Sequence, residues 1–142
     1  MSQKGLKLAC GIILLFSVFL AIGNASNSNE DDLKKRFADY MAVVSSLQET
    51  NNDEKGVDLV RAFFDPKDNA DNIAKRIYET WKKYKLISYS IEDISISNDG
   101  NTGTFTFNGS IEKADGSKIT VSQGFKWKKV NGIWYRNAEI PS

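Results

Sequence analysis

The side chains that most often carry chemistry are scarce in this chain. It has no histidine, and its one cysteine, Cys10, lies near the amino terminus. A Ser-His-Asp triad and an imidazole metal site are therefore absent. The acidic stretch DPKDNAD brings Asp65, Asp68 and Asp71 together, but it lacks the glycine and the closing glutamate of a helix-loop-helix calcium site. We predict a turn followed by a helix there, with no metal and no cofactor.

The stretch WKKVNGIWYRNAEI, residues 127–140, combines aromatic and basic side chains and so has two interpretations. Such clusters occur on nucleic-acid-binding surfaces. The stretch also contains Asn131-Gly132, a pair that tight hairpin turns prefer, between runs that alternate as strands do. The first 25 residues, which are interpreted below as a cleaved signal, contain two lysines and no acidic residue. Without them, 17 of the 19 basic residues remain, against 18 acidic ones. This balance favours the hairpin, and we predict no binding to nucleic acid.

The first 25 residues are typical of a secretory signal peptide. Two lysines precede an apolar run at residues 12–23, and Gly23 and Ala25 are the small residues that a signal peptidase reads. The run is about half of the roughly 20 residues that a membrane-spanning helix needs. We therefore predict cleavage after Ala25, export to the periplasm or beyond the cell, and no membrane attachment afterwards. The alternative keeps residues 8–23 as the anchor of an envelope-assembly subunit.

The rest of the chain is interpreted as a polar linker at residues 26–29 and one domain at residues 30–142. Apolar residues first recur at spacings of three and four, which predicts helices. From Leu86 onward they alternate with polar residues, which predicts strands. The predicted helices cover residues 29–48, 57–64 and 68–84, and the predicted strands cover residues 86–97, 103–112, 118–129 and 133–140.

The predicted strands are joined by Asp99-Gly100, Asp115-Gly116 and Asn131-Gly132. These pairs favour tight hairpin turns, because the backbone there adopts positive φ. The alternation changes phase at Glu92-Asp93, which predicts a bulge. We expect an α+β domain in which three N-terminal helices pack on a four-stranded antiparallel meander.

Two segments resemble the nuclear transport factor 2-like superfamily. GVDLVRAFFDP, residues 56–66, is similar to the family's second helix, which often ends in an aromatic residue followed by Asp-Pro. Residues 88–140 are similar to its closing sheet. Within them KKVNGIWYR, residues 128–136, matches the common pattern of an apolar residue, a short turn with glycine, an apolar residue and tryptophan. The resemblance extends over residues 30–140 and implies a strongly curved sheet wrapped around the helices as a cone with a pocket. It points to an exported bacterial branch of unknown function.

This resemblance gives the aromatic side chains two alternative roles. They recur on the core side of the predicted elements, so they either fill an aromatic-rich core or line the apolar pocket of the cone. The residues assigned to the candidate ligand pocket are Tyr40, Tyr78, Trp81, Phe107, Trp127 and Trp134.

We expect an exported, non-catalytic binding or interaction module. Its pocket would take a small apolar ligand, or its sheet would bind a partner or a second copy as a homodimer, as many members of the superfamily do. The residues predicted to form the polar outer face of the sheet are Thr104, Thr106, Lys118, Thr120, Ser122 and Lys126.

The alternative function is a small isomerase- or cyclase-like enzyme. The family's enzymatic branch uses a pocket carboxylate as base and a tyrosine or protonated aspartate as oxyanion donor. The candidate acids are Asp39, Glu92, Asp93, Glu112 and Glu139, and the candidate donors are Tyr40, Tyr78 and Tyr89. Glu139 is the candidate base, because it shares strand parity with Ile133 and Tyr135.

Overall fold

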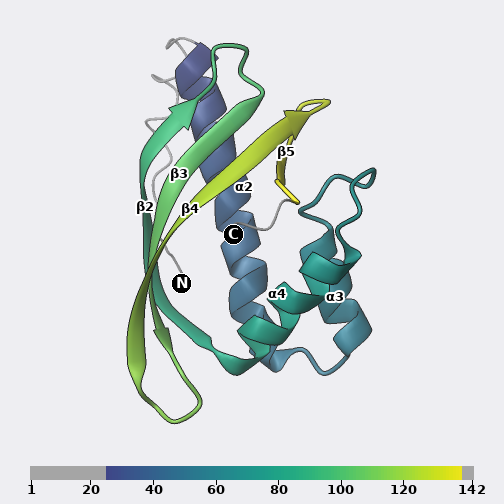
Figure 1. Cartoon of the computed structure of the whole chain (residues 1–142), viewed down its shortest axis with the longest axis vertical. Coiled ribbons are helices and arrows are strands. Elements are labelled where there is room, and N and C mark those ends of the chain that lie inside the picture. Colours follow the sequence, from purple (N-terminus) through teal and green to yellow (C-terminus); the bar gives the residue numbers. More distant parts are fainter. Residues whose placement is uncertain (1–24, 139–142) are drawn as a thin grey trace, which may run out of the picture.

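The computed structural model describes residues 25–138, with side chains from residue 28 onward. Its helices are α2 (Ala25–Ser46), the 3-10 turn η1 (Leu47–Glu49), α3 (Asp53–Arg61) and α4 (Asp71–Lys83). Its strands are β2 (Lys85–Ile96), β3 (Thr102–Glu112), β4 (Lys118–Val130) and β5 (Ile133–Arg136). Helix α2 runs along one face of the curved sheet, and α3 and α4 form the side of the molecule away from β2 (Figure 1). The predicted α+β class, with three helices before a four-stranded antiparallel sheet, is confirmed.

Helix α2 carries the predicted apolar stripe but begins earlier than predicted. Residues 26–29, expected as a linker, belong to the helix. Asn29, where the predicted helix began, accepts a hydrogen bond from Nζ of Lys129 at 2.8 Å, so its side chain joins the helix to β4. The predicted signal peptide lies outside the described residues, apart from Ala25. Within residues 25–138, no helix is long and apolar enough to cross a membrane.

Helices α3 and α4 differ from the predicted ranges at their ends. Helix α3 begins after Asn52, whose side chain accepts a hydrogen bond from the amide of Lys55 at 3.0 Å and caps the helix. It ends at Arg61, so Phe63 and Phe64 lie in the following turn rather than in the helix. Helix α4 starts three residues later than predicted, because Asp68 is held in that turn.

The sheet has the order β2-β3-β4-β5 with every neighbouring pair antiparallel. The predicted turns are confirmed by positive φ at Gly100 (76°), Gly116 (87°) and Gly132 (82°). The predicted bulge is confirmed by φ of 57° at Asp93 and a register shift between Glu92 and Ser95. Strand β5 ends at Arg136, so the last predicted strand is shorter than expected.

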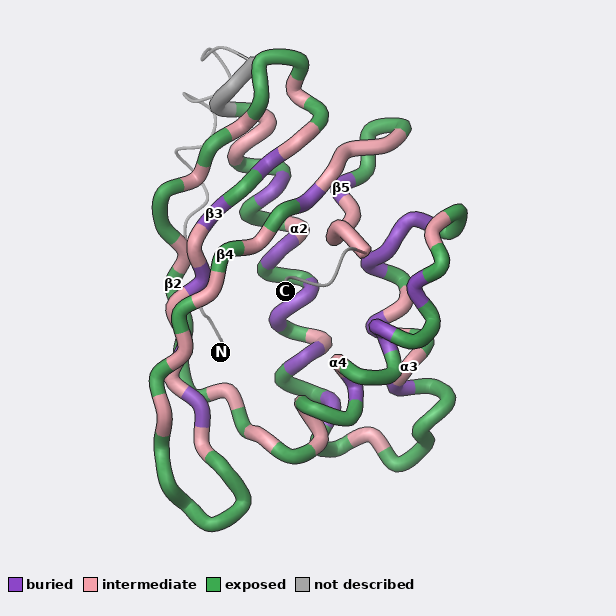
Figure 2. Tube along the Cα trace, viewed as in Figure 1, coloured by how far each residue is buried: buried purple, intermediate pink, exposed green. Residues whose placement is uncertain are grey.

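The two faces of the sheet have opposite character. Along β3, buried positions alternate with less buried ones (Figure 2), and the buried side chains include Phe105, Phe107 and Ile111. On the other face, the predicted polar residues are exposed, apart from the half-buried Thr106. The exposed members are Thr104, Lys118, Thr120, Ser122 and Lys126.

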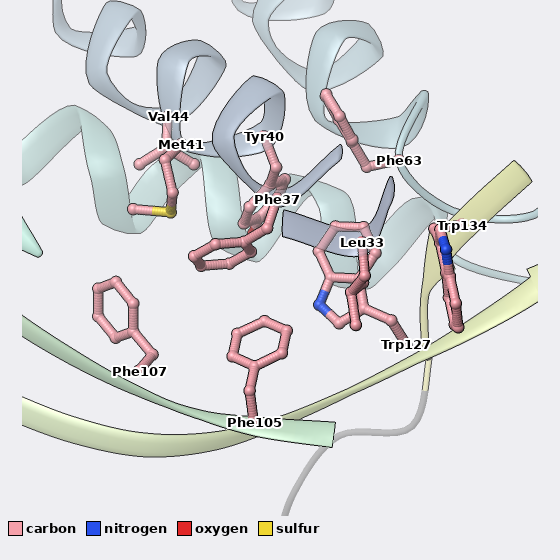
Figure 3. Close-up of a cluster of buried hydrophobic side chains, with 10 residues drawn as sticks. All are labelled: Leu33, Phe37, Tyr40, Met41, Val44, Phe63, Phe105, Phe107, Trp127 and Trp134. Carbon is pink, nitrogen blue, oxygen red and sulfur yellow. The ribbon is translucent and has the colours of Figure 1, made fainter. Parts of the chain in front are cut away.

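Phe37 of α2 lies at the centre of the main hydrophobic core (Figure 3). Its side chain is 1% exposed, and its ring centroid lies 4.7–6.0 Å from six other aromatic rings. The nearest of these is Phe105 of β3, at 4.7 Å and 66°. Edge-to-face contacts of this kind add to the free energy gained from burial. A second buried cluster joins η1, α3 and α4 through Leu47, Val60 and Ala74.

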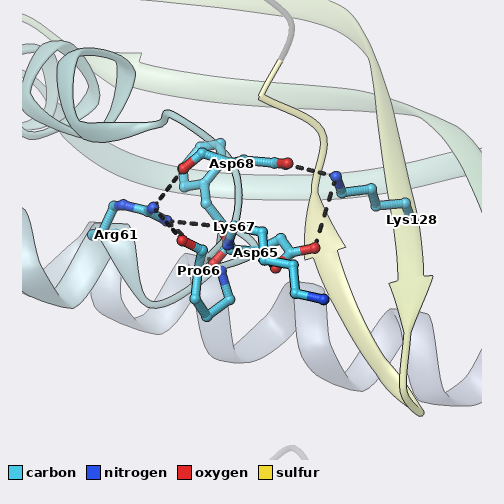
Figure 4. Close-up of polar contacts among 7 residues, drawn as sticks. Arg61, Asp65, Pro66, Lys67, Asp68 and Lys128 are labelled. Carbon is cyan, nitrogen blue, oxygen red and sulfur yellow. Dashed lines mark hydrogen bonds and ion pairs between the residues drawn. The ribbon is translucent and has the colours of Figure 1, made fainter.

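Polar contacts fasten the turn after α3 to the sheet (Figure 4). The guanidinium of Arg61 donates to the backbone carbonyls of residues 64, 65, 66 and 68. Nζ of Lys128 on β4 lies 2.6 Å from a carboxylate oxygen of Asp68 and 4.0 Å from one of Asp65. The acidic stretch that superficially resembles a calcium site therefore forms a turn, and two of its carboxylates form ion pairs with Lys128. No cluster of potential metal ligands occurs among the described residues.

The substitution Phe37→Ala tests the central packing. We expect it to lower the free energy of unfolding by about 3–5 kcal/mol, because a large buried ring is lost and a cavity remains. Urea unfolding followed by circular dichroism measures this change. Lys126→Ala, on the exposed face of β4, serves as control and should change it by less than about 0.5 kcal/mol. Similar values for both variants would contradict the assignment of Phe37 to the core.

A double-mutant cycle tests the link between the turn and the sheet. The single substitutions Lys128→Ala and Asp68→Ala, and their combination, should give a coupling free energy of about 1 kcal/mol, because the two charges are partly shielded from water. The four proteins are compared by urea unfolding at low salt. Additive effects of the two substitutions would show that the ion pair does not stabilise the fold.

Candidate functional site

A cavity of about 450 Å³ lies between α4 and the inner face of β3 and β4. Helix α2 and strand β5 each contribute side chains to its wall. The apolar lining residues are Met41, Ile73, Ile77, Trp81, Phe107, Ile111, Ile119, Val121 and Phe125. The polar or charged lining residues, tyrosines included, are Tyr40, Arg76, Thr80, Tyr84, Gln123 and Arg136.

The cavity follows from incomplete cover of β4 by the helices. At one end of its inner face, Trp127 is fully buried under α2. Towards the other end, Phe125, Val121 and Ile119 are only half-buried, although they share the same strand parity. The aromatic core around Phe37 therefore fills one part of the cone, and the remaining part stays open and lined by apolar side chains.

Arg136 and Tyr40 form the main polar pair of the cavity wall. Nη1 of Arg136 donates a short hydrogen bond to the hydroxyl oxygen of Tyr40. The guanidinium carbon of Arg136 lies 4.8 Å from the ring centroid of Phe125 and 5.9 Å from that of Phe64. Burial raises the pKa of Tyr40 above its ordinary value, and the charge of Arg136 opposes that rise. Tyr40 therefore stays protonated at neutral pH.

The charge of the cavity wall is one-sided. Two arginines, Arg76 and Arg136, line it, and none of its described lining residues is an aspartate or glutamate. The ion pairs among the described residues involve Arg61 and Lys128 and leave these two arginines without a carboxylate. The described wall is thus mainly apolar, and its formal charges are positive.

The six predicted pocket residues divide into two groups. Tyr40, Trp81 and Phe107 line the cavity. Trp127 does not, because it is 0% exposed within the core. Trp134 does not line the cavity either. Its ring packs beside Gly103, and a Cβ added to that glycine would lie 3.5 Å from the ring. Trp134 also borders a separate hollow of about 200 Å³.

Tyr78, the remaining predicted pocket residue, belongs to α4, and its ring packs on α3. Its ring covers Gly56 so closely that an added Cβ would lie 2.2 Å from it. Its hydroxyl donates a hydrogen bond to a carboxylate oxygen of Asp53 at 2.5 Å. The ring therefore serves helix packing rather than the cavity.

None of the described candidate acids of the enzyme alternative lines the cavity. Asp39, Glu92 and Asp93 are exposed, and Glu112 is half-buried at the end of β3. Glu139, the candidate base, lies outside the described residues. Tyr89 is 39% exposed on β2 and stacks on Phe107 with ring centroids 6.0 Å apart.

Arg136, Gln123 and Arg76 were not among the predicted site residues. Strand parity, which decides the face of the sheet on which a residue lies, could have identified Gln123 and Arg136. Gln123 lies between Val121 and Phe125 in the inward-facing series of β4, and Arg136 lies two residues after the buried Trp134 in β5. A polar side chain at an inward position is a marker of a cavity, because in a filled core it would need its own hydrogen-bond partners.

Comparison with known proteins places the fold but no activity. No family model and no curated protein matches the chain. A designed protein of the nuclear transport factor 2-like type aligns with a TM-score of 0.55 and 16% identity, over 75% of this chain and 94% of its own. At this identity the similarity shows the fold alone, and the fold is nuclear transport factor 2-like.

Two further solved structures align less closely. A SEC-C motif containing protein from Rhodopseudomonas palustris has a TM-score of 0.47 and 15% identity, over 59% of this chain and 64% of that one. The intermembrane space region of the chloroplast protein ARC6 has a TM-score of 0.41 and 12% identity, over 73% and 88%.

Tyr78 gives the fold a measurable response to high pH. Its hydrogen bond to Asp53, together with burial and the carboxylate charge, raises its pKa from 10.0 to about 12. Protonated Tyr78 therefore stabilises the folded state fully below about pH 10, and this contribution is lost as the pH rises through about 12. We expect the difference in unfolding free energy between wild type and Tyr78→Phe to shrink from about pH 8 to about pH 11. Urea unfolding measures it, and a constant difference would contradict the bond.

Proposed function

We propose that this protein is a non-catalytic binding module whose cone cavity takes one small, largely apolar ligand. The observation that carries the proposal is the open cavity of about 450 Å³ with nine apolar and six polar or charged lining residues. Pockets of roughly 300–1,000 Å³ with apolar walls and a few polar groups are typical of small-molecule sites. The nuclear transport factor 2-like fold supports the same interpretation.

The half-buried apolar side chains provide the driving force for binding. Ile77 and Trp81 of α4 face Ile119 and Val121 of β4 across the cavity, and all four are half-buried. A ligand between them would remove apolar surface from water, which contributes about 2.5 kcal/mol for each 100 Å². A ligand also loses freedom on binding, so only part of this free energy contributes to affinity.

Export remains part of the proposal. The positively charged start, the apolar run at residues 12–23 and the small residues before Ser26 support a cleaved signal. Amino-terminal sequencing of the exported protein tests it, and a start at Ser26 rules out the retained anchor. Homodimer formation through the sheet also remains a prediction, which sedimentation at high protein concentration tests.

The isomerase- or cyclase-like alternative has weaker support. Such enzymes need a carboxylate base next to the bound substrate. None of the described cavity-lining residues supplies one, so this alternative depends on Glu139 alone. Loss of a measured isomerase activity in Glu139→Gln would be needed to favour it.

Binding of the neutral fluorophore N-phenyl-1-naphthylamine tests the cavity. Its emission rises in apolar surroundings, and we expect saturable binding of one molecule per chain. Val121→Trp places a large ring in the cavity and should weaken binding at least about tenfold, since the apolar contact area is lost. Thr120→Trp introduces the same ring on the exposed face of the same strand and should leave the affinity unchanged.

Two outcomes would contradict the cavity as the binding site. One is the absence of saturable binding to the wild-type protein. The other is equal affinity in both tryptophan variants, which would place the dye elsewhere. Thermal unfolding of each variant checks that it is folded during the titration.

A further inference from the structure

We infer that the ligand is an amphipathic carboxylate, with an apolar body in the cavity and its carboxylate bound by Arg136 and Tyr40. The inference rests on the proposed function, because it names the chemical class of the ligand for the same cavity. It depends on three observations: the position of Arg136, the unused donors of the pair, and the apolar character of most of the remaining wall.

Among the described residues, the side chain of Arg136 is surrounded by aromatic rings and pairs with no acid. Its guanidinium carbon lies 4.8 Å from the ring centroid of Phe125, 5.6 Å from that of Tyr40 and 5.9 Å from that of Phe64. No carboxylate of the described residues lies within ion-pair distance of it. A half-buried cation without a counter-charge is unfavourable, and a bound anion relieves that cost.

The pair has hydrogen-bond donors to spare. A guanidinium carries five N–H groups, and the described side-chain bonds of Arg136 use one group, directed to Tyr40. Because the Tyr40 oxygen accepts that bond, its own O–H remains a donor, and no described residue accepts from it. A carboxylate beside both groups would receive two parallel N–H bonds from arginine and one O–H bond from tyrosine. This arrangement matches the planar, two-oxygen geometry of a carboxylate.

The rest of the wall fits an apolar body attached to that head group. Gln123 and Arg136 lie among the lining residues of the sheet, and the neighbouring inward positions of β3 and β4 are Phe107, Ile119 and Val121. Trp81 and Ile77 face them from α4. A fully polar anion such as phosphate would leave these side chains in contact with water. A neutral hydrocarbon would leave Arg136 with no anionic partner among the described residues. An amphipathic anion would both cover the apolar side chains and pair with Arg136.

Competition against bound N-phenyl-1-naphthylamine by decanoate and by decanol tests the inference. The two competitors share a chain length and differ in the charge of the head group. We expect the wild-type protein to bind decanoate at least about tenfold more tightly, as two charge-assisted hydrogen bonds allow. In Arg136→Met, which keeps an apolar side chain without the charge, this preference should fall below about threefold. Lys126→Met, on the exposed face of β4, also removes one positive charge and should retain the preference for decanoate.

The outcomes separate the inference from the proposed function. Displacement of the dye by both competitors with equal affinity would overturn the carboxylate assignment and leave the binding module intact. Failure of the dye to bind would overturn the proposed function itself. A third outcome is that Arg136→Met still prefers decanoate over decanol while Arg76→Met does not. It would place the carboxylate next to α4 and overturn the assignment to Arg136.

A second variant keeps the test decisive if Arg136→Met does not fold. Tyr40→Phe keeps the buried ring and removes the hydroxyl donor. We expect its preference for decanoate over decanol to fall about threefold or more. An unchanged preference in this variant would contradict the role of Tyr40 in holding the carboxylate.

Discussion

The packing of Phe37 against the curved sheet is the contact on which the rest of the structure depends. Its ring touches aromatic side chains from β2, β3 and β4 at once, and so it fixes α2 across three strands. Large inward-facing rings at that end, including Trp127, fill the space between the curved sheet and the helix. Arg36, the preceding residue, adds a hydrogen bond of 2.9 Å from Nε to the carbonyl of Trp134, which ties β5 to the same helix.

The cavity is the other consequence of that arrangement. Helix α2 covers one end of the inner face, while α4 is held at a distance by its packing on α3 and η1 through Tyr78 and Ala74. The open volume between them is bounded by strands whose inward residues keep their apolar character beyond the filled core. Arg136 lies at the boundary, with Phe125 on the cavity side and Phe64 on the helical side. One residue thus connects the core, the turn after α3 and the candidate site.

Local sequence patterns predict most of the fold but only part of the site. Asp-Gly and Asn-Gly pairs and the alternation of apolar and polar residues specify the meander, because backbone conformation and strand parity are local properties. The start of α2 could not be predicted, since Asn29 contacts Lys129, which is distant in sequence. Tyr40 and Trp127 were both predicted to line the pocket because each lies on the core side of its element. Tyr40 lines the cavity and Trp127 does not, because long-range packing decides between these roles. Arg136 could have been predicted as a cavity residue, because it lies two positions after Trp134 and therefore on the same face of its strand.

A crystal structure of the protein grown with decanoate tests the central claim most directly. The account predicts one decanoate in the cavity, with its carboxylate within hydrogen-bond distance of Arg136 and Tyr40 and its chain between Trp81 and Val121. Decanoate bound on the outer face of the sheet, with the cavity filled only by water, would contradict it.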